Sequence, residues 1–160
     1  MPPSSDHDAF MREAAQMAHE NVLAGRGGPF GAVIVRKGEI VGRGTNVVTS
    51  TNDPTAHAEV TAIRDACRRL HTFTLAGCEI YTSCEPCPMC LAAIYWARLE
   101  KIFYANTRVD AARIGFDDDF LYREITLPHD QRSTPILPLP SDEAAATFKL
   151  WTTKSDKVPY

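Results

Sequence analysis

The sequence predicts an α/β protein in which helices cover the faces of a sheet. The centre of the chain alternates between helical and strand patterns, and this order requires crossover connections between strands. The chain has 160 residues, of which 44% are hydrophobic and 23% are charged. This size and balance are typical of one globular domain. We therefore expect a single domain with one core and one site.

The first part of the chain is expected to form a helix and then a hairpin. Apolar residues in the segment 6–23 recur near helical spacing, and the glycine-rich run at 25–31 ends that helix. Two strands follow at 30–35 and 39–43, around a turn at Lys37-Gly38. This hairpin is the only clear antiparallel pair that the sequence indicates.

The rest of the chain continues the alternation. The expected elements are a helix that starts at Asp53-Pro54, a strand at 78–82, a helix at 88–97, a strand at 101–105 and a short helix at 107–114. Four prolines between residues 128 and 140 indicate an extended segment. Ser141 is then the expected N-cap of a last helix that runs to about residue 153.

Charge and cysteine usage exclude several classes of protein. The net charge of -3 argues against a main task of binding a phosphate backbone. The chain has no apolar run near the roughly 18 residues that span a bilayer, and its first residues do not resemble an export signal. We therefore expect a cytoplasmic protein, with no nucleic-acid or membrane partner. In a reducing compartment, five cysteines indicate metal binding or catalysis rather than disulfides.

Two short motifs carry the ligands of a predicted zinc site: PTAHAEV, which contains His57, and SCEPCPMC, which contains Cys87 and Cys90. A catalytic zinc takes three nitrogen or sulfur ligands and keeps one position open for water. The two cysteines are three residues apart at a predicted helix start, so one turn brings both sulfurs to the same face. The free N–H groups of that helix end favour the thiolate form, which binds metal.

Glu59 is the predicted catalytic group beside the metal. Residues two apart do not share a helix face, so His57 and Glu59 meet only if His57 lies at the helix start. A carboxylate next to a metal-activated water can accept a proton and return it. An H-x-E motif followed by P-C-x-x-C is the signature of hydrolytic zinc deaminases, in which the glutamate is not a ligand.

With these motifs the chain resembles the zinc-dependent cytidine/purine deaminase superfamily and, within it, the small bacterial guanine deaminases. The resemblance runs nearly end to end. The segments that carry it are GGPFGAVIV, DPTAHAEVTAIR, YTSCEPCPMCLAAIYWAR, GFDDDF and the terminal tyrosine. The GFDDDF segment and the terminal tyrosine narrow the resemblance to the enzymes that act on guanine.

The resemblance implies a three-layer α/β/α, cytidine-deaminase-like fold around a mixed five-stranded sheet, with one zinc per subunit. It implies that a zinc-activated water attacks carbon 2 of guanine and that Glu59 passes a proton to the departing amine, which gives xanthine and ammonia. It further implies a homodimer, with one domain over residues 1–160 whose segment at about 141–160 is exchanged between subunits.

The resemblance also implies the substrate contacts. Asn46 and Asp118 are expected to hydrogen-bond the purine, Phe30 to stack on it and Trp96 to wall the pocket. Tyr160 is expected to close the site of the partner chain. A buried carboxylate such as Asp118 suits guanine, because it rejects bases that lack the matching N–H groups.

The sequence motifs also allow other functions for the metal site and for its surrounding residues. The metal site agrees with a closed structural clip, with Glu59 or Cys84 as a fourth ligand, and with a zinc-stabilised interaction module that has no catalytic role. Within the deaminases, the motifs also agree with an enzyme for guanosine or for adenosine in transfer RNA. Phe30 and Trp96 have the composition of ordinary core residues.

Overall fold

The computed structural model describes residues 5–160. The chain divides into two compact units, one that ends at Leu121 and one that runs from Tyr122 to Tyr160. No helix in the described part of the chain is long and apolar enough to cross a membrane. In chain order the elements are α1 (Ser5–Leu23), β1 (Gly31–Arg36), β2 (Glu39–Thr45), α2 (Val48–Thr51), α3 (Ala58–Leu70), β3 (Cys78–Cys84), α4 (Pro88–Trp96), β4 (Lys101–Asn106), α5 (Arg108–Arg113), α6 (Asp118–Thr126), the 3-10 helix η1 (His129–Gln131) and α7 (Asp142–Thr153).

The sheet is mixed, as expected, but it has four strands over residues 5–160 rather than five. Its order is β2-β1-β3-β4; β1 pairs antiparallel with β2 and β3, and β3 pairs parallel with β4. After β4 the chain forms α5 and α6, and the segment from Pro128 to Pro140 contains four prolines. Proline has no N–H for a strand ladder, so this segment is a poor candidate for a fifth strand.

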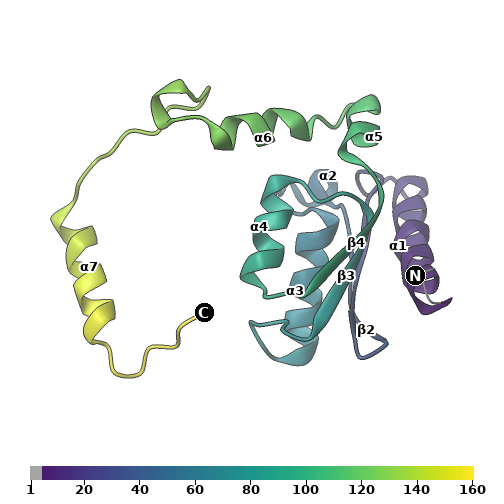
Figure 1. Cartoon of the computed structure of the whole chain (residues 1–160), viewed down its shortest axis with the longest axis horizontal. Coiled ribbons are helices and arrows are strands. Elements are labelled where there is room, and N and C mark those ends of the chain that lie inside the picture. Colours follow the sequence, from purple (N-terminus) through teal and green to yellow (C-terminus); the bar gives the residue numbers. More distant parts are fainter. Residues whose placement is uncertain (1–4) are drawn as a thin grey trace. The chain divides into compact units, whose positions relative to one another are not determined.

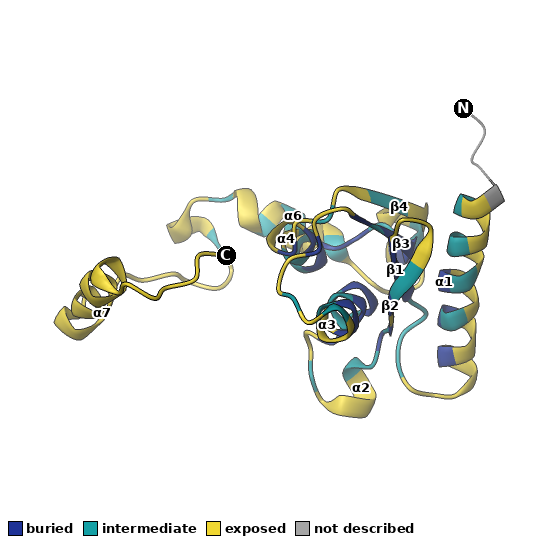
Figure 2. Ribbon diagram, turned by 90° about the horizontal axis from the view of Figure 1, so that it is seen from below, coloured by how far each residue is buried: buried dark blue, intermediate teal, exposed yellow. Residues whose placement is uncertain are grey.

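Helices cover both faces of the sheet and form three layers (Figures 1 and 2). On one face, α1 packs on Val33, Val35 and Tyr81. On the other face, Ile34 and Ile80 join the alanines of α3 and part of α4 in the main core. Alternate residues of β1 therefore enter opposite cores, as the period of two in a strand requires.

The helix α3 lies unusually close to β2. A Cβ atom on Gly44 would lie 2.2 Å from the carbonyl oxygen of Ala58 and 2.3 Å from the amide nitrogen of Ala62. Real atoms do not approach so closely, so only glycine fits at this point. The first turn of α3, which follows His57, is thus held against the backbone of β2.

The hairpin turn forms as the sequence predicts. Lys37 and Gly38 both have positive φ, at 52° and 81°, and they join two strands that pair up to Arg36 and Glu39. Two positive φ angles in a two-residue loop match the twist of an antiparallel pair.

The predicted start of the second long helix is wrong. That helix begins at Ala58, not at Asp53-Pro54. Asp53 instead closes a turn, in which its Oδ1 accepts hydrogen bonds from the backbone N–H and the hydroxyl of Thr55, at 2.9 and 2.6 Å. Aspartate side chains compete with helix formation in this way. The short helix α2 and the helix α6 were not expected either.

The second unit contains η1 and α7. Ser141 caps α7 as predicted, because its Oγ accepts a hydrogen bond from the backbone N–H of Ala144 at 3.2 Å. No residue from 122 to 160 is buried, and Leu139 and Phe148 are 93% and 80% exposed. This unit therefore has no hydrophobic core of its own.

Candidate metal centre and catalytic site

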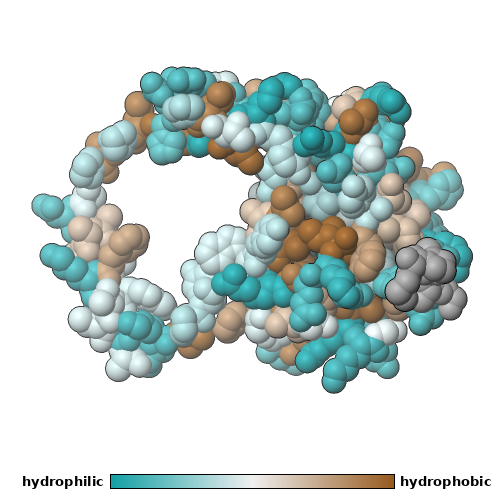
Figure 3. Space-filling model, in the orientation of Figure 1, coloured by the Kyte–Doolittle hydropathy of each residue, from teal (hydrophilic) through white to brown (hydrophobic). Residues whose placement is uncertain are grey.

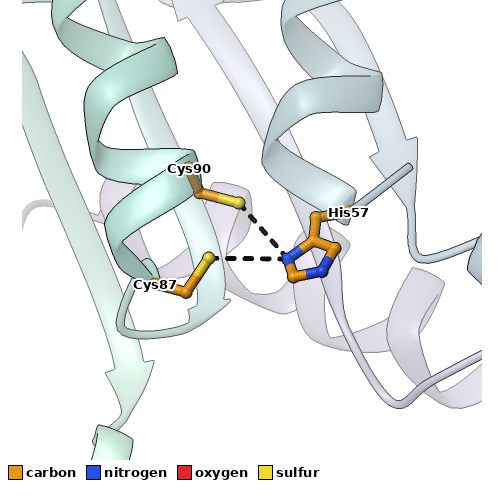
Figure 4. Close-up of side chains that lie close together, drawn as sticks. All are labelled: His57, Cys87 and Cys90. Atoms are coloured by element: carbon orange, nitrogen blue, oxygen red, sulfur yellow. Dashed lines mark hydrogen bonds between the residues drawn. The ribbon is translucent and has the colours of Figure 1, made fainter. Parts of the chain in front are cut away.

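Two helix N-termini bring the predicted ligands together (Figure 4). The Nδ1 atom of His57 lies 3.6 Å from the Sγ of Cys87 and 3.5 Å from the Sγ of Cys90. The three ligand atoms all lie within 4.8 Å of one another. His57 precedes α3 and Cys87 precedes α4, while Cys90 is fully buried in the first turn of α4.

The local sequence explains this geometry. His57 and Cys87 are the N-caps of their helices, and both have extended backbones with ψ near 160°. Neither side chain makes a capping hydrogen bond to its own helix. Pro88 fits the first position of α4, where a backbone N–H has no helical partner anyway.

The electrostatics of the cluster favour a thiolate. The pKa of Cys87 is lowered to about 4, first because the Cys90 thiol donates a hydrogen bond to the thiolate and then because His57 lies beside it. The same contact with Cys87 raises the pKa of the His57 imidazole. Thiolate sulfur is the form of cysteine that binds metal.

Glu59 lies beside the cluster but outside the ligand set. It is 6% exposed, and burial raises the pKa of its carboxyl group. Its Oε1 accepts a hydrogen bond from the Thr82 hydroxyl at 3.3 Å. Because His57 precedes the helix with an extended backbone, the two side chains line one cavity although they are two residues apart.

The cavity has a volume of about 220 Å³, and three predicted substrate contacts, Phe30, Asn46 and Asp118, line it together with His57 and Glu59. Burial raises the pKa of Asp118, and the negative charge of the cysteine thiolate adds to this effect.

The amide of Asn46 has a fixed orientation. Its Oδ1 accepts hydrogen bonds from the backbone N–H groups of Gly28 and Val48, at 3.2 and 3.3 Å. With the oxygen occupied, the side chain offers its nitrogen, a hydrogen-bond donor, to a ligand. The backbone carbonyl of Asn46 is itself held at 2.8 Å by the buried Nδ2 of Asn21.

Sequence reasoning missed several residues that line the cavity. Phe116 packs edge-to-face on Phe30, with ring centroids 4.9 Å apart and an interplanar angle of 83°. Phe116 lies in the GFDDDF segment, in which only the aspartates were interpreted as candidate substrate contacts. Cys84 and Glu85 also line the cavity. The Cys84 thiol donates to the carbonyl of Thr107 at 3.7 Å, and burial raises its pKa to about 11.

Two predicted contacts are not brought to this cavity. Trp96 ends α4, is 63% exposed and does not line the cavity, so within one chain it does not wall the pocket as expected. Tyr160 ends the second unit and is 77% exposed. Its role at the site of a partner chain stays a prediction.

The residues of the cluster fit a catalytic zinc. One imidazole nitrogen and two sulfurs make the three-ligand set that leaves a position for water. Over residues 5–160 the cluster contains neither Cys84 nor Glu59, so the closed clip imagined from the sequence does not form. The fold and these ligands define the class of the protein as an α/β/α protein with a three-ligand zinc site of the catalytic type.

Residues 4–106 match the family model described as cytidine and deoxycytidylate deaminase zinc-binding region, and the chain belongs to this family. The family assignment agrees with the H-x-E and P-C-x-x-C motifs and with the cluster that they form.

Individual relatives cover different shares of the chain. This chain is 52% identical to guanine deaminase of Bacillus subtilis strain 168, and the match covers 97% of this chain and 99% of the relative. The crystal structure of a guanine deaminase from Bacillus subtilis superposes with a TM-score of 0.93, over 96% and 98% of the two chains. A structure of guanine deaminase from Nitrosomonas europaea has a TM-score of 0.66 and 34% identity over 69% and 64%. A tRNA-specific adenosine deaminase of Aquifex aeolicus is 51% identical, but over only 48% of this chain and 51% of that one.

Removal of one ligand is expected to abolish metal binding. In Cys90→Ser the zinc content falls from about one per chain to near zero, since loss of a ligand costs more than the ~10- to 100-fold in affinity that follows loss of an outer partner. Atomic absorption after dialysis measures this. Cys67→Ser, outside the cluster, is the matched control and keeps its zinc; retention of zinc by Cys90→Ser would contradict the ligand assignment.

Proposed function

We propose that this chain hydrolyses guanine to xanthine and ammonia. The observation that carries the proposal is a cavity that joins the metal cluster and Glu59 to one hydrogen-bond donor, Asn46, and one carboxylate acceptor, Asp118. The full-length similarity to guanine deaminase of Bacillus subtilis supports the same substrate.

The polar groups of the cavity match the guanine ring. Guanine has a ring carbonyl, which accepts a hydrogen bond, and ring N–H groups, which donate. The Asn46 nitrogen pairs with the carbonyl, and the Asp118 carboxylate pairs with the N–H groups. Adenine has no ring carbonyl, so it would leave the Asn46 nitrogen without an acceptor. A site with buried polar groups rejects an analogue that leaves them unpaired.

The size and shape of the cavity favour a free base. Its volume of about 220 Å³ is below the roughly 300–1,000 Å³ that is usual for larger ligands. Phe30 and Phe116 give it an apolar wall against which a flat ring can pack. A sugar or a phosphate would have to extend beyond this space.

The chemistry divides between the metal and Glu59. His57, Cys87 and Cys90 would hold the zinc, which when bound would supply a water whose pKa is lowered to about 7. The Glu59 carboxylate accepts the proton that this water loses and delivers it to the amino nitrogen at carbon 2. A carbon–oxygen bond forms, the carbon–nitrogen bond breaks, and ammonia leaves with the transferred proton.

The alternatives differ in what the cavity would have to admit. A transfer RNA substrate would bring phosphates to a cavity that Glu85 and Asp118 also line. Such carboxylates oppose a polyanion. Guanosine needs space for ribose beside the base. A non-catalytic zinc module does not require a buried carboxylate next to the metal ligands.

The substrate is tested by ammonia release from guanine, guanosine, adenine and cytosine with the zinc-loaded protein. We expect turnover of guanine and none of adenine or cytosine.

The variant Glu59→Gln should keep its zinc and its fold but lose about 10²- to 10⁴-fold in kcat, because the proton relay is removed. Preference for guanosine would contradict the free-base assignment, and full activity of Glu59→Gln would contradict the mechanism.

Asp118→Asn tests base recognition separately from metal binding. The amide presents an N–H group where guanine donates, so kcat/KM for guanine should fall by about 100-fold, while the zinc content stays unchanged. Asp119→Asn is the matched control, one residue further on and outside the cavity. Equal loss in both variants, or loss of zinc with activity, would show that the aspartate is structural.

We also propose that the chain works as a homodimer in which residues 141–160 are exchanged. The second unit has no fully buried residue, and it carries exposed apolar side chains such as Leu139 and Phe148. Hydrophobic side chains also gather between α4 and β4 in the first unit (Figure 3). Both elements carry an exposed aromatic ring as well, Tyr95 on α4 and Tyr104 on β4. Such surfaces mark protein interfaces. A partner's α7 and Tyr160 would cover these apolar surfaces and close the site.

The cytoplasmic location that the sequence indicates stays a prediction.

Mixing two inactive variants tests the exchange. One chain carries Glu59→Gln with an intact tail, and the other carries Glu59 but ends at residue 154. If the tail completes the partner's site, mixed dimers recover about one active site each, measured as ammonia release after joint refolding. If the tail acts within its own chain, the mixture stays as inactive as its components.

A further inference from the structure

We infer that Thr82 is a positioning residue that holds the carboxylate of Glu59 in place for proton transfer. The inference rests on the proposed function, in which Glu59 carries the proton. It is based on one buried contact and on the strand that presents it.

The contact joins two groups that are nearly closed to solvent. The Thr82 hydroxyl donates to Oε1 of Glu59 at 3.3 Å, and the two residues are 1% and 6% exposed. Thr82 does not line the cavity, whereas Glu59 does. The threonine therefore acts on a ligand only through the glutamate.

The position of this hydroxyl is unusual for its surroundings. Alternate residues of β3 share one face, and on this face Cys78 and Ile80 belong to the main hydrophobic core. Valine has nearly the same volume as threonine and no polar atom, so packing alone does not call for a hydroxyl here. A buried hydroxyl costs free energy unless it is hydrogen-bonded, and the hydrogen bond of Thr82 is made to Glu59.

The strand makes Thr82 a rigid support. In the sheet, Thr82 of β3 is paired with Ala32 of β1 on one side and with Tyr104 of β4 on the other. A residue in the middle of a sheet cannot shift without its neighbours. The glutamate side chain, in contrast, has three rotatable bonds, and a fixed hydrogen bond restricts them.

The contact assigns different tasks to the two oxygens of Glu59. Oε1 accepts the hydrogen bond of Thr82, and we assign to Oε2 the proton that passes from water to the amino nitrogen. The hydroxyl thereby fixes the direction in which the carboxylate faces the cavity. Loss of the hydroxyl should therefore affect the chemical step more than the binding of the base.

The first experiment compares kcat and KM for guanine in Thr82→Val, Thr82→Ser and an unchanged chain. Thr82→Val is expected to lower kcat by about 10- to 100-fold, the usual cost of an outer hydrogen-bond partner, with KM and zinc content unchanged. Thr82→Ser keeps the hydroxyl and should retain most of kcat. Ile80→Val is the matched control, because it changes packing on the same face and carries no hydrogen-bonding group. Thr82→Ala replaces the valine variant if that one does not fold.

The second experiment does not depend on turnover: crystal structures of the zinc-loaded variants show where the Glu59 carboxylate lies. Displacement in Thr82→Val but not in Thr82→Ser supports the inference, even if guanine proves not to be the substrate. An unmoved carboxylate, or a loss of kcat as large in Ile80→Val as in Thr82→Val, overturns it while the proposed function stands.

Discussion

The close packing of α3 against β2 is the constraint on which the site depends. Glycine at position 44 lets the helix approach until its backbone meets that of the strand, and this contact fixes the first turn of α3. His57 and Glu59 belong to that turn, one just before it and one within it. A side chain on Gly44 would push both away from the cysteines of α4, because the helix would have to move as a whole.

The metal ligands were predictable because the information for them is local. His57, Cys87 and Cys90 lie at helix starts, where spacing and capping determine which way a side chain points. The hairpin turn at Lys37-Gly38 and the cap at Ser141 are local in the same sense.

What could not be predicted depends on contacts between distant segments. The hydrogen bond from Thr82 to Glu59 requires the register of β3 in the sheet. The orientation of Asn46 requires the backbone of Gly28, eighteen residues earlier. The strand count was wrong because it came from resemblance alone, and the start of α3 was misplaced because Asp53 closes a turn of its own.

The division of the chain also has a consequence for the order in which the protein is made. Every proposed ligand and catalytic group lies between residues 57 and 90, and the cavity lining ends at Asp118. The ribosome synthesises chains from the N-terminus, and domains generally fold as units in that order. The metal centre can thus be complete while residues 122–160 are still being translated. Acquisition of metal and the proposed pairing with a second chain would then be separate events in time, with the exposed apolar side chains open to solvent between them.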